Sequence, residues 1–172
     1  MKKVSKYVVV TLFVLGLALF VSNSYVFAAG TSTGYLGVSA SVASSCSVGA
    51  SSLSFGVYNA SANLNGTGAI NVTCSTGTPY HLTLDGGSNS ANVNTDYGQW
   101  ALKSGVSNYL SYDLSTETDI PAGLITPNVQ FGNYTGTGSQ VAVTIYGIIR
   151  LGQSSAPGGS YIDLINVTLN YD

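Results

Sequence analysis

The chain has 172 residues and a formal net charge of −2, and only 7% of its residues are charged, whereas an ordinary soluble domain carries about 25%. Its 45% content of hydrophobic residues makes it too apolar to be disordered. A sequence pI near 5.0 makes it too acidic to bind the phosphates of nucleic acids. The length allows one domain with a short additional segment.

Residues 1–28 have the pattern of a secretory signal peptide. Three lysines precede an uncharged apolar run over 7–21, which is shorter than the roughly 20 residues that a membrane-spanning helix needs. Small residues follow this run, and Val26 and Ala28 fit the positions that signal peptidase recognises. We therefore expect cleavage after Ala28, or alternatively after Ala29, and a retained membrane anchor is the competing interpretation.

Removal of residues 1–28 would leave two cations, Lys103 and Arg150, against seven acidic residues, which is a formal net charge of −5. Serine, threonine and asparagine then make up about a third of the chain. Uncharged hydroxyl and amide groups must therefore supply most of the hydrated surface. A domain of this size buries about two thirds of its unfolded surface, which is enough for one core without a metal ion.

The two cysteines, Cys46 and Cys74, both follow the expected cleavage site. In an oxidising compartment an even pair is interpreted first as a disulfide. Closing this loop would contribute about 3.5 kcal/mol in the chain-entropy model. No CxxC motif is present, and two cysteines with the single His81 cannot complete a tetrahedral zinc site. We expect a disulfide and no metal centre.

Short runs in which apolar and polar residues alternate indicate β-strands, and no stretch after residue 28 has helical periodicity. The clearest run is the last, over 165–171. Similar runs lie at 36–42, 70–74, 82–84, 110–114 and 141–145, separated by turn signals rich in Gly, Asn and Pro. About seven strands without helical connections predict an all-β fold, an antiparallel sandwich.

Two stretches, 86–108 and 115–135, are less regular and are expected to form long loops or a weak extra strand. Trp100 lies in the first of them. Together with some of the 12 tyrosines, an aromatic side chain in such a loop would suit a secreted carbohydrate-binding module. That function is one alternative left open by the sequence.

The composition argues against an enzyme. His81 is the only histidine, no G-x-S-x-G motif is present, and alternation makes this histidine a solvent-facing strand residue. Glu117 and Asp119 are the closest pair of acids, and the sequence cannot fix the carboxylate separation that glycoside hydrolysis requires. The Asp85-Gly86-Gly87 stretch lacks the ligand positions of a calcium loop and indicates a turn. We expect no catalytic, cofactor-binding or metal-binding residues.

The alternating run over 36–42 lies before the first cysteine and beside a flexible Thr-Ser-Thr-Gly start. Its apolar positions are Leu36, Val38, Ala40 and Val42. The run could be the ordinary first strand of the sandwich. It could also be a detachable strand that pairs with another molecule, because main-chain hydrogen bonds give affinity and alternate side chains give register. The residues alone favour the ordinary strand.

Several separated motifs occur in an order that is specific although each motif alone is weak. They are ASSCSV (43–48), LSFG (53–56), INVTC (70–74), LTLDGG (82–87), YLSYDL (109–114), VTIYG (143–147) and GGSYID (158–163). On these motifs the chain resembles the spore coat protein U family, whose members include pilus subunits of archaic chaperone-usher systems in Gram-negative bacteria. The resemblance spans nearly all of the chain after residue 28.

The resemblance implies an incomplete immunoglobulin-like, pilin-type sandwich that lacks its last strand. The missing strand leaves an apolar groove bounded by unpaired N–H and C=O groups, which would aggregate if left open. In such systems a periplasmic chaperone fills the groove first, and the N-terminal extension of the next subunit replaces it at an outer-membrane usher.

Carried over to this sequence, the resemblance makes residues 29–43 the donor-strand extension and 44–172 the sandwich domain. It implies a Cys46–Cys74 disulfide, and it assigns Leu36, Val38, Ala40 and Val42 to the side chains that enter the neighbour's groove. The groove walls are expected from the first strand after Cys46 and from the final strand. The expected groove residues are Ile165, Val167, Leu169 and Tyr171.

The function implied is a structural subunit of a surface fimbria that supports adhesion or biofilm formation. The expected partners are the chaperone, the usher and related subunits; nucleic acid and membrane insertion of the mature chain are not expected. A coat or matrix protein of the same fold is the second alternative. One departure concerns Arg150, which lies farther from Gly147 than the family pattern suggests, so we expect a displaced loop there.

Overall fold

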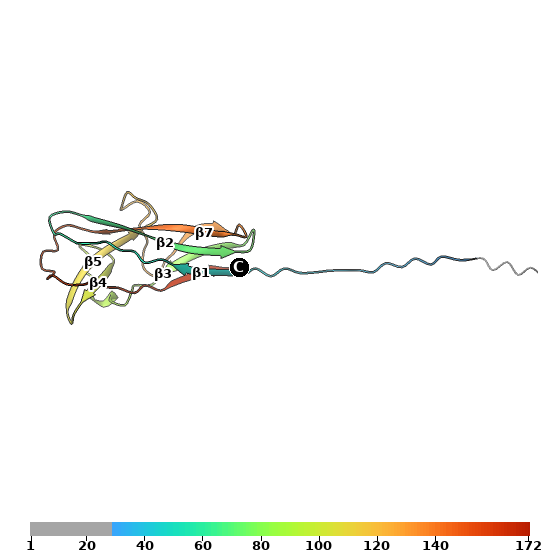
Figure 1. Cartoon of the computed structure of the whole chain (residues 1–172), viewed down its shortest axis with the longest axis horizontal. Helices are drawn as coiled ribbons and strands as arrows, with labels where there is room; N and C mark the ends of the chain where they lie inside the picture. The colour runs from blue at the N-terminus through green and yellow to red at the C-terminus, as the bar shows by residue number, and fades with distance from the viewer. Residues whose placement is uncertain (1–28) are drawn as a thin grey trace, which may run out of the picture. The chain divides into compact units, whose positions relative to one another are not determined.

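The computed structural model describes residues 29–172, and the expected signal peptide, 1–28, lies outside the described residues. Eight strands and one short 3₁₀ helix make up the regular structure of this part (Figure 1). The elements are β1 (Cys46–Ala50), β2 (Leu64–Cys74), β3 (Pro79–Leu84), η1 (Ser90–Asn92), β4 (Trp100–Ser104), β5 (Asn108–Ser115), β6 (Gln130–Thr135), β7 (Gln140–Ile149) and β8 (Val167–Tyr171).

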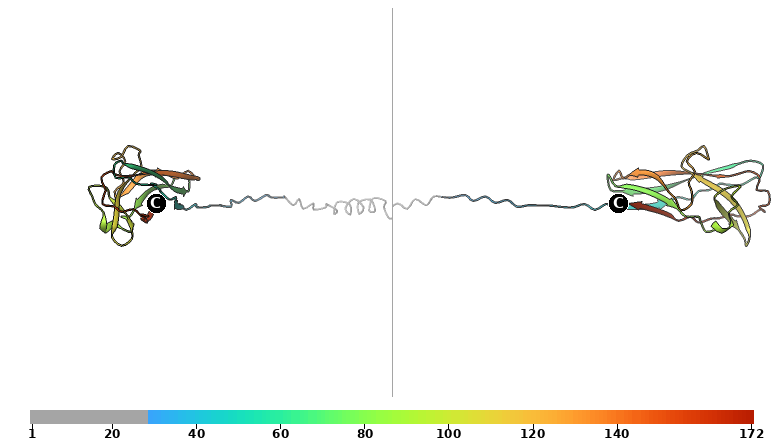
Figure 2. Two further views of the ribbon diagram at one scale, coloured as in Figure 1. Left: turned by 60° about the vertical axis from the view of Figure 1, so that its left-hand side comes forward. Right: turned by 180° about the vertical axis from the view of Figure 1, so that it is seen from behind.

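The strands form two antiparallel sheets that share one core. The five-stranded sheet has the order β1-β2-β7-β5-β4, and the three-stranded sheet has the order β6-β3-β8. Figure 2 shows the two layers from two further directions. This arrangement confirms the predicted all-β antiparallel sandwich.

The core follows directly from the alternation of the strands. In β3, Tyr80, Leu82 and Leu84 are buried while His81 and Thr83 are half-buried on the other face. In β2 and β7, alternate positions likewise supply buried aliphatic side chains to the same cluster. These strands therefore each contribute one face to a single apolar core.

The predicted disulfide is present. Cys46 at the start of β1 lies directly opposite Cys74 at the end of β2, and their Sγ atoms are 2.00 Å apart. The bond ties the first strand of the domain to its neighbour at the point where the N-terminal extension joins the sandwich.

Three expectations from the sequence need correction. The run over 36–42 forms no strand here, because regular structure begins only at Cys46. The two stretches expected as long loops contain β4 and β6, in line with the alternative of an extra strand. Trp100 starts β4 with 0% exposure, and its Nε1 donates a hydrogen bond to the carbonyl oxygen of Asp85 at 2.8 Å. This burial removes Trp100 as an aromatic platform for a carbohydrate.

Candidate functional site

The edge strands of the two sheets, β1 and β8, lie beside each other (Figures 1 and 2). Cys46 pairs with Cys74, and Tyr171 pairs with Tyr80. Because the short turn after Cys74 leads into β3, the start of β1 and the end of β8 lie at the same end of the sandwich. The two strands therefore run in opposite directions along one side of the domain.

The outer edge of β8 carries unpaired backbone groups. The N–H of Asp85 donates to the carbonyl of Asn166 at 3.1 Å, and the N–H of Ser88 donates to the carbonyl of Leu164 at 2.9 Å. Even-numbered residues thus direct their backbone groups toward β3. In an extended strand the odd-numbered residues then direct theirs outward. These are the backbone groups of Ile165, Val167, Leu169 and Tyr171, which have no neighbouring strand on that side within residues 29–172.

The other two outermost strands, β4 and β6, are protected. Lys103 of β4 exchanges two backbone hydrogen bonds with Ile162, at 2.9 and 3.0 Å, so a passing segment covers that edge. The β6 edge is interrupted at Gly132, whose φ of 71° belongs to the left-handed region, and the pairing with β3 shifts there. The carbonyl of Gly132 instead accepts from Nδ1 of His81 at 2.6 Å, so this histidine is not simply solvent-facing. A new strand is accommodated best along β1 and β8.

A hollow of about 520 Å³ opens where the chain continues from the end of β1 and approaches the start of β8. Its floor consists of apolar core residues from both sheets. Leu53 and Phe55, after β1, form one wall, and Ile165 and Val167, at the start of β8, form the other. The hollow is an apolar groove of the kind that a missing strand would leave.

Leu53 and Phe55 reach the interior because glycines make room for them. A Cβ atom on Gly66 would lie 2.9 Å from the Leu53 side chain, and one on Gly147 would lie 2.7 Å from the Phe55 ring. Both glycines point inward, on β2 and β7 respectively. The LSFG motif therefore runs along β2, where Ser54 bridges to Thr67, and its Leu53 and Phe55 side chains extend over the inner face of the sheet and narrow the groove.

A second hollow of about 640 Å³ continues beyond this narrowing. It is bounded by the segment after Phe55 and by the Pro157–Tyr161 stretch. The two hollows share four lining residues: Leu53, Phe55, Leu102 and Tyr161. The groove thus has two compartments joined at one constriction.

The predicted groove residues divide into two pairs. Ile165 and Val167 line the first hollow. Leu169 packs against the core without lining either hollow, and Tyr171 is 45% exposed at the end of β8. Ile165 precedes β8 and is not part of that strand.

The predicted donor residues are all solvent-exposed. Leu36 is 89% exposed, Val38 86% and Val42 93%, and Ala40 is exposed as well. Such exposure of successive aliphatic side chains is costly for a soluble chain unless another surface covers them.

A polar pair that the sequence did not predict lies in the first hollow. The hydroxyl of Tyr112 donates to Oδ2 of Asp163 at 2.9 Å, and Oδ1 of Asp163 accepts from Nδ2 of Asn89 at 3.0 Å and from the N–H of Leu164 at 2.9 Å. Tyr112 also stacks on Trp100 and meets Phe55 edge to face. The contact fixes the wall before β8 to the core.

Burial shapes the titration of this pair. Burial raises the pKa of the Asp163 carboxyl, and its hydrogen bonds offset only part of that rise. Burial, the neighbouring Asp163 charge and the hydrogen bond to it raise the pKa of Tyr112 far above its usual range. The phenol therefore remains the donor at any physiological pH.

Asp85 anchors the next part of the same wall. Its Oδ1 accepts from the N–H groups of Gly87 at 2.9 Å and Asn166 at 3.0 Å, and its Oδ2 accepts from Nδ2 of Asn166 at 2.5 Å. Burial alone would raise the pKa of this carboxyl, but these hydrogen bonds outweigh it and leave the pKa below its ordinary value. Hydrogen-bond donors from Gly87 and Asn166 thus hold the Asp85 carboxylate at the end of β3, and no metal ion is needed to satisfy it.

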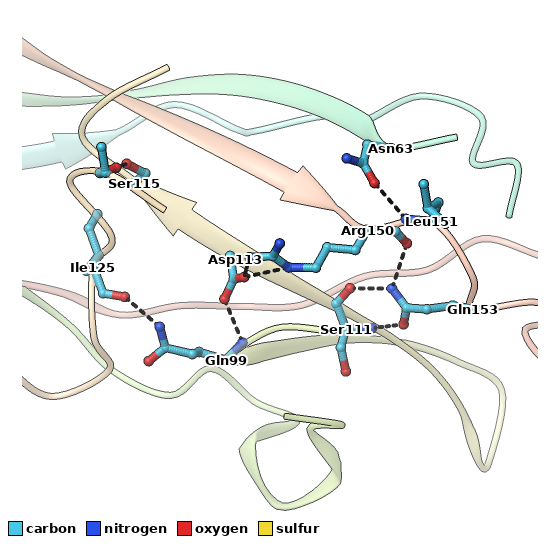
Figure 3. A network of polar contacts seen from close by, with 10 residues as sticks. Asn63, Gln99, Ser111, Asp113, Ser115, Ile125, Arg150, Leu151 and Gln153 are labelled. Carbon is cyan, nitrogen blue, oxygen red and sulfur yellow. Dashed lines mark hydrogen bonds and ion pairs between the residues drawn. The ribbon is translucent and has the colours of Figure 1, made fainter. Parts of the chain in front are cut away.

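A further polar network holds the chain after β7 (Figure 3). Arg150 forms an ion pair with the buried Asp113 at 2.8 Å. Gln153 acts like a strand residue beside β5: its Oε1 accepts from the N–H of Ser111 at 2.7 Å, and its Nε2 donates to the carbonyl of Ser111 at 2.8 Å. Arg150 thus has a defined partner despite its distance from Gly147. The ion pair and the Gln153 hydrogen bonds also hold the start of the segment that leads into the second hollow.

Among residues 29–172 no group of three or more His, Cys, Asp or Glu side chains is placed to hold a metal ion. In the same part of the chain, no helix has the length and apolar character required to cross a membrane.

Comparisons with known proteins agree with this geometry. The family model of the Spore Coat Protein U domain matches residues 32–168. The fold is similar to a chain in the crystal structure of the CsuC–CsuE chaperone–tip adhesion subunit pre-assembly complex from the archaic chaperone-usher Csu pili of Acinetobacter baumannii. That match has 22% identity and a TM-score of 0.53, and it covers 74% of this chain and 40% of that one. A comparison with curated protein sequences finds no match.

Proposed function

Because the chain belongs to the Spore Coat Protein U domain family, we propose that it is a structural, non-catalytic subunit of a surface pilus that is assembled by donor-strand exchange. The N-terminal extension, 29–43, of one copy fills the groove between β1 and β8 of the next. The observation that carries this proposal is the open β8 edge above an apolar groove, in a chain whose own extension exposes alternating aliphatic side chains.

The topology supports a head-to-tail polymer. An extension that runs antiparallel to β8 enters along Tyr171 and leaves past Ile165. The domain attached to that extension then lies at the opposite end from Cys46, where this chain's own extension begins. Each copy would offer its groove and its extension at opposite ends, which is the condition for an open linear fibre.

The expected joint is strong and slow to exchange. Each of the four side chains Leu36, Val38, Ala40 and Val42 contributes on the order of 1 to 3 kcal/mol when buried. Backbone hydrogen bonds along the odd-numbered residues of the β8 edge add to this sum. Once made, such a joint would not need covalent bonds between subunits.

The remaining steps follow from the same proposal. A periplasmic chaperone covers the groove before assembly, and an outer-membrane usher exchanges it for the next extension. Residues 1–28 direct export, and the finished fibre lies on the cell surface, where it serves adhesion or biofilm formation. A coat protein with the same fold would use the same joint and differ in its destination.

The proposal is tested by changing the two faces of the extension separately. Val38→Asp places a charge on the face that enters the groove, whereas Ser39→Asp places the same charge on the opposite face. We expect Val38→Asp to abolish fibres on the cell surface, as seen by electron microscopy, and Ser39→Asp to leave them. Deletion of residues 29–43 should give a folded, chaperone-bound subunit without fibres, and normal fibres from that variant would contradict the proposal.

A further inference from the structure

The two compartments of the groove indicate which residue of an incoming extension faces which residue of the wall. This inference rests on the proposed function. Exposed and half-buried positions alternate from Tyr161 through Leu169. The wall is therefore one extended segment that includes the residues before β8 as well as the start of β8. Its inward side chains, in order from the strand outward, are Val167, Ile165, Asp163 and Tyr161.

These four inward positions differ in what surrounds them. Val167 and Ile165 face the wide first hollow. Asp163 is held there by Tyr112 and marks a polar position in an otherwise apolar groove. Tyr161 belongs to both hollows and leads into the second. The wall therefore offers two apolar positions and then a polar one in the first hollow, followed by Tyr161 where the two hollows meet.

The extension has the matching order. Leu36 and Val38 are large, Ala40 is the smallest of its apolar residues, and Val42 is large again. We propose that the extension of one copy pairs antiparallel to the wall of the next in the register Leu36–Val167, Val38–Ile165, Ala40–Asp163 and Val42–Tyr161. Ala40 then lies at the Tyr112–Asp163 pair, which makes this pair the element that selects a small side chain at that position.

The chain after Val42 fits this register. Ala43, Ser44 and Ser45 are the residues before the next domain begins at Cys46. In the proposed register they pass Ser160, Gly159 and Gly158, and a Cβ on Gly158 would meet nothing within 4 Å. Ala43, Ser44 and Ser45 would therefore pass the Gly158–Ser160 side of the second hollow, where there is free space at Gly158.

A register shifted by four residues is the principal competitor. It would pair Leu36 with Tyr171 and Val42 with Ile165. The largest side chain would then lie beside a residue that is 45% exposed, Ala40 would face the wide hollow, and the second hollow would remain empty. The proposed register fills both hollows.

The register is tested with pairs of cysteines in the full chain, expressed in its own host. Directly opposed residues of antiparallel strands are about 4.5 to 5.5 Å apart between Cα atoms, within reach of a disulfide. We expect Val38→Cys combined with Ile165→Cys to give a ladder of linked subunits on non-reducing denaturing gels. Val38→Cys combined with Leu169→Cys should give none, because four residues displace the pair by roughly 13 Å. A ladder from the second pair only, or fibres without a ladder from the first pair, would overturn the register.

A second measurement does not depend on new cysteines. Ala40→Leu and Val38→Leu both enlarge the extension, and neither changes the sandwich itself. We expect Ala40→Leu to reduce the amount of surface fibre about tenfold or more, because the larger apolar side chain would press against the hydrogen-bonded Asp163 carboxylate. Val38→Leu should change the amount by less than about twofold. Equal fibre amounts from both variants would refute the role of the Tyr112–Asp163 pair.

These outcomes separate the register from the function. Fibres that form normally but link through the 38 and 169 positions would leave the pilus proposal intact and refute the register. Absence of any fibre from the unaltered chain in its host would instead refute the pilus proposal.

Discussion

The runs over 36–42 and 165–171 have the same alternating pattern, yet the second enters a sheet and the first does not. The final run pairs with β3 and packs Leu169 against the core, whereas the first run forms no strand and its apolar side chains are exposed. An isolated strand gains no backbone partners and buries no side chains, so it is not stable alone. Alternation therefore shows that a segment can be a strand, and the available neighbour decides whether it becomes one.

The largest expected effect comes from breaking the link at the boundary between the two regions. Cys46→Ser removes the disulfide where the extension meets β1, and we expect a loss of about 2 to 5 kcal/mol in the free energy of unfolding. Urea denaturation and the periplasmic level of the subunit measure this loss. Ser47→Ala, one residue further along β1, serves as the control, and an unchanged stability of Cys46→Ser would contradict a structural role for the bond.

Equivalent leucines in the two runs give the most direct comparison. Leu169→Ala removes a side chain packed against the core, so we expect about 2 kcal/mol of destabilisation. Leu36→Ala removes an 89% exposed side chain, and the stability of the monomeric domain should change by less than about 0.5 kcal/mol. Chemical denaturation of both variants measures the difference. Equal losses would show that the extension already packs on its own domain.

A smaller effect is expected at the wall before β8. Tyr112→Phe keeps the ring that stacks on Trp100 but removes the hydrogen bond to Asp163. We expect a loss of about 1 kcal/mol, because Asp163 retains its donors from Asn89 and Leu164. Thermal unfolding of this variant is compared with Tyr109→Phe on the same strand, and a loss no greater than that of the control would argue against the contact.

The smallest effects concern pH. The folded pKa of Asp85 is below its ordinary value of 3.8, so its contribution to stability is complete above that value and is lost as the pH falls through the folded pKa. The folded pKa of Asp163 is above 3.8, so its contribution is greatest below 3.8 and declines as the pH rises through the folded pKa.

Stability measured against pH tests both signs. Asp85→Asn should flatten the loss of stability on acidification, and Asp163→Asn should remove a loss on the alkaline side of pH 3.8. Asp96→Asn at an exposed turn is the matched control. A slope of the opposite sign would contradict the hydrogen bonds assigned to Asp85 or the burial assigned to Asp163.

Much of the fold could be predicted from local patterns. Regular alternation located β2, β3, β5, β7 and β8, and the cysteine count predicted the disulfide. The sequence indicates β6 only as a loop or a weak extra strand, because Gly132 interrupts its alternation with a bulge. The burial of Trp100 depends on Asp85 and Tyr112, and no pattern within its own segment reports that contact.

The site shows the same division. Ile165 and Val167 could be placed by alternation, and they do line the groove. The Tyr112–Asp163 contact joins residues 51 positions apart, and its two partners lie in separate motifs that suggest no pairing. The second hollow depends on how Leu53 and Phe55 pass over inward-facing glycines, which requires the register of β2 against β7.

The burial of the single tryptophan gives the molecule an internal optical probe. Trp100 is 0% exposed and stacks on Tyr112, which itself lines the first hollow. Only the Tyr112 ring therefore separates the fluorescent indole from the groove in which an incoming strand would lie. Excitation of this one indole can follow filling of the groove in real time, without any added dye.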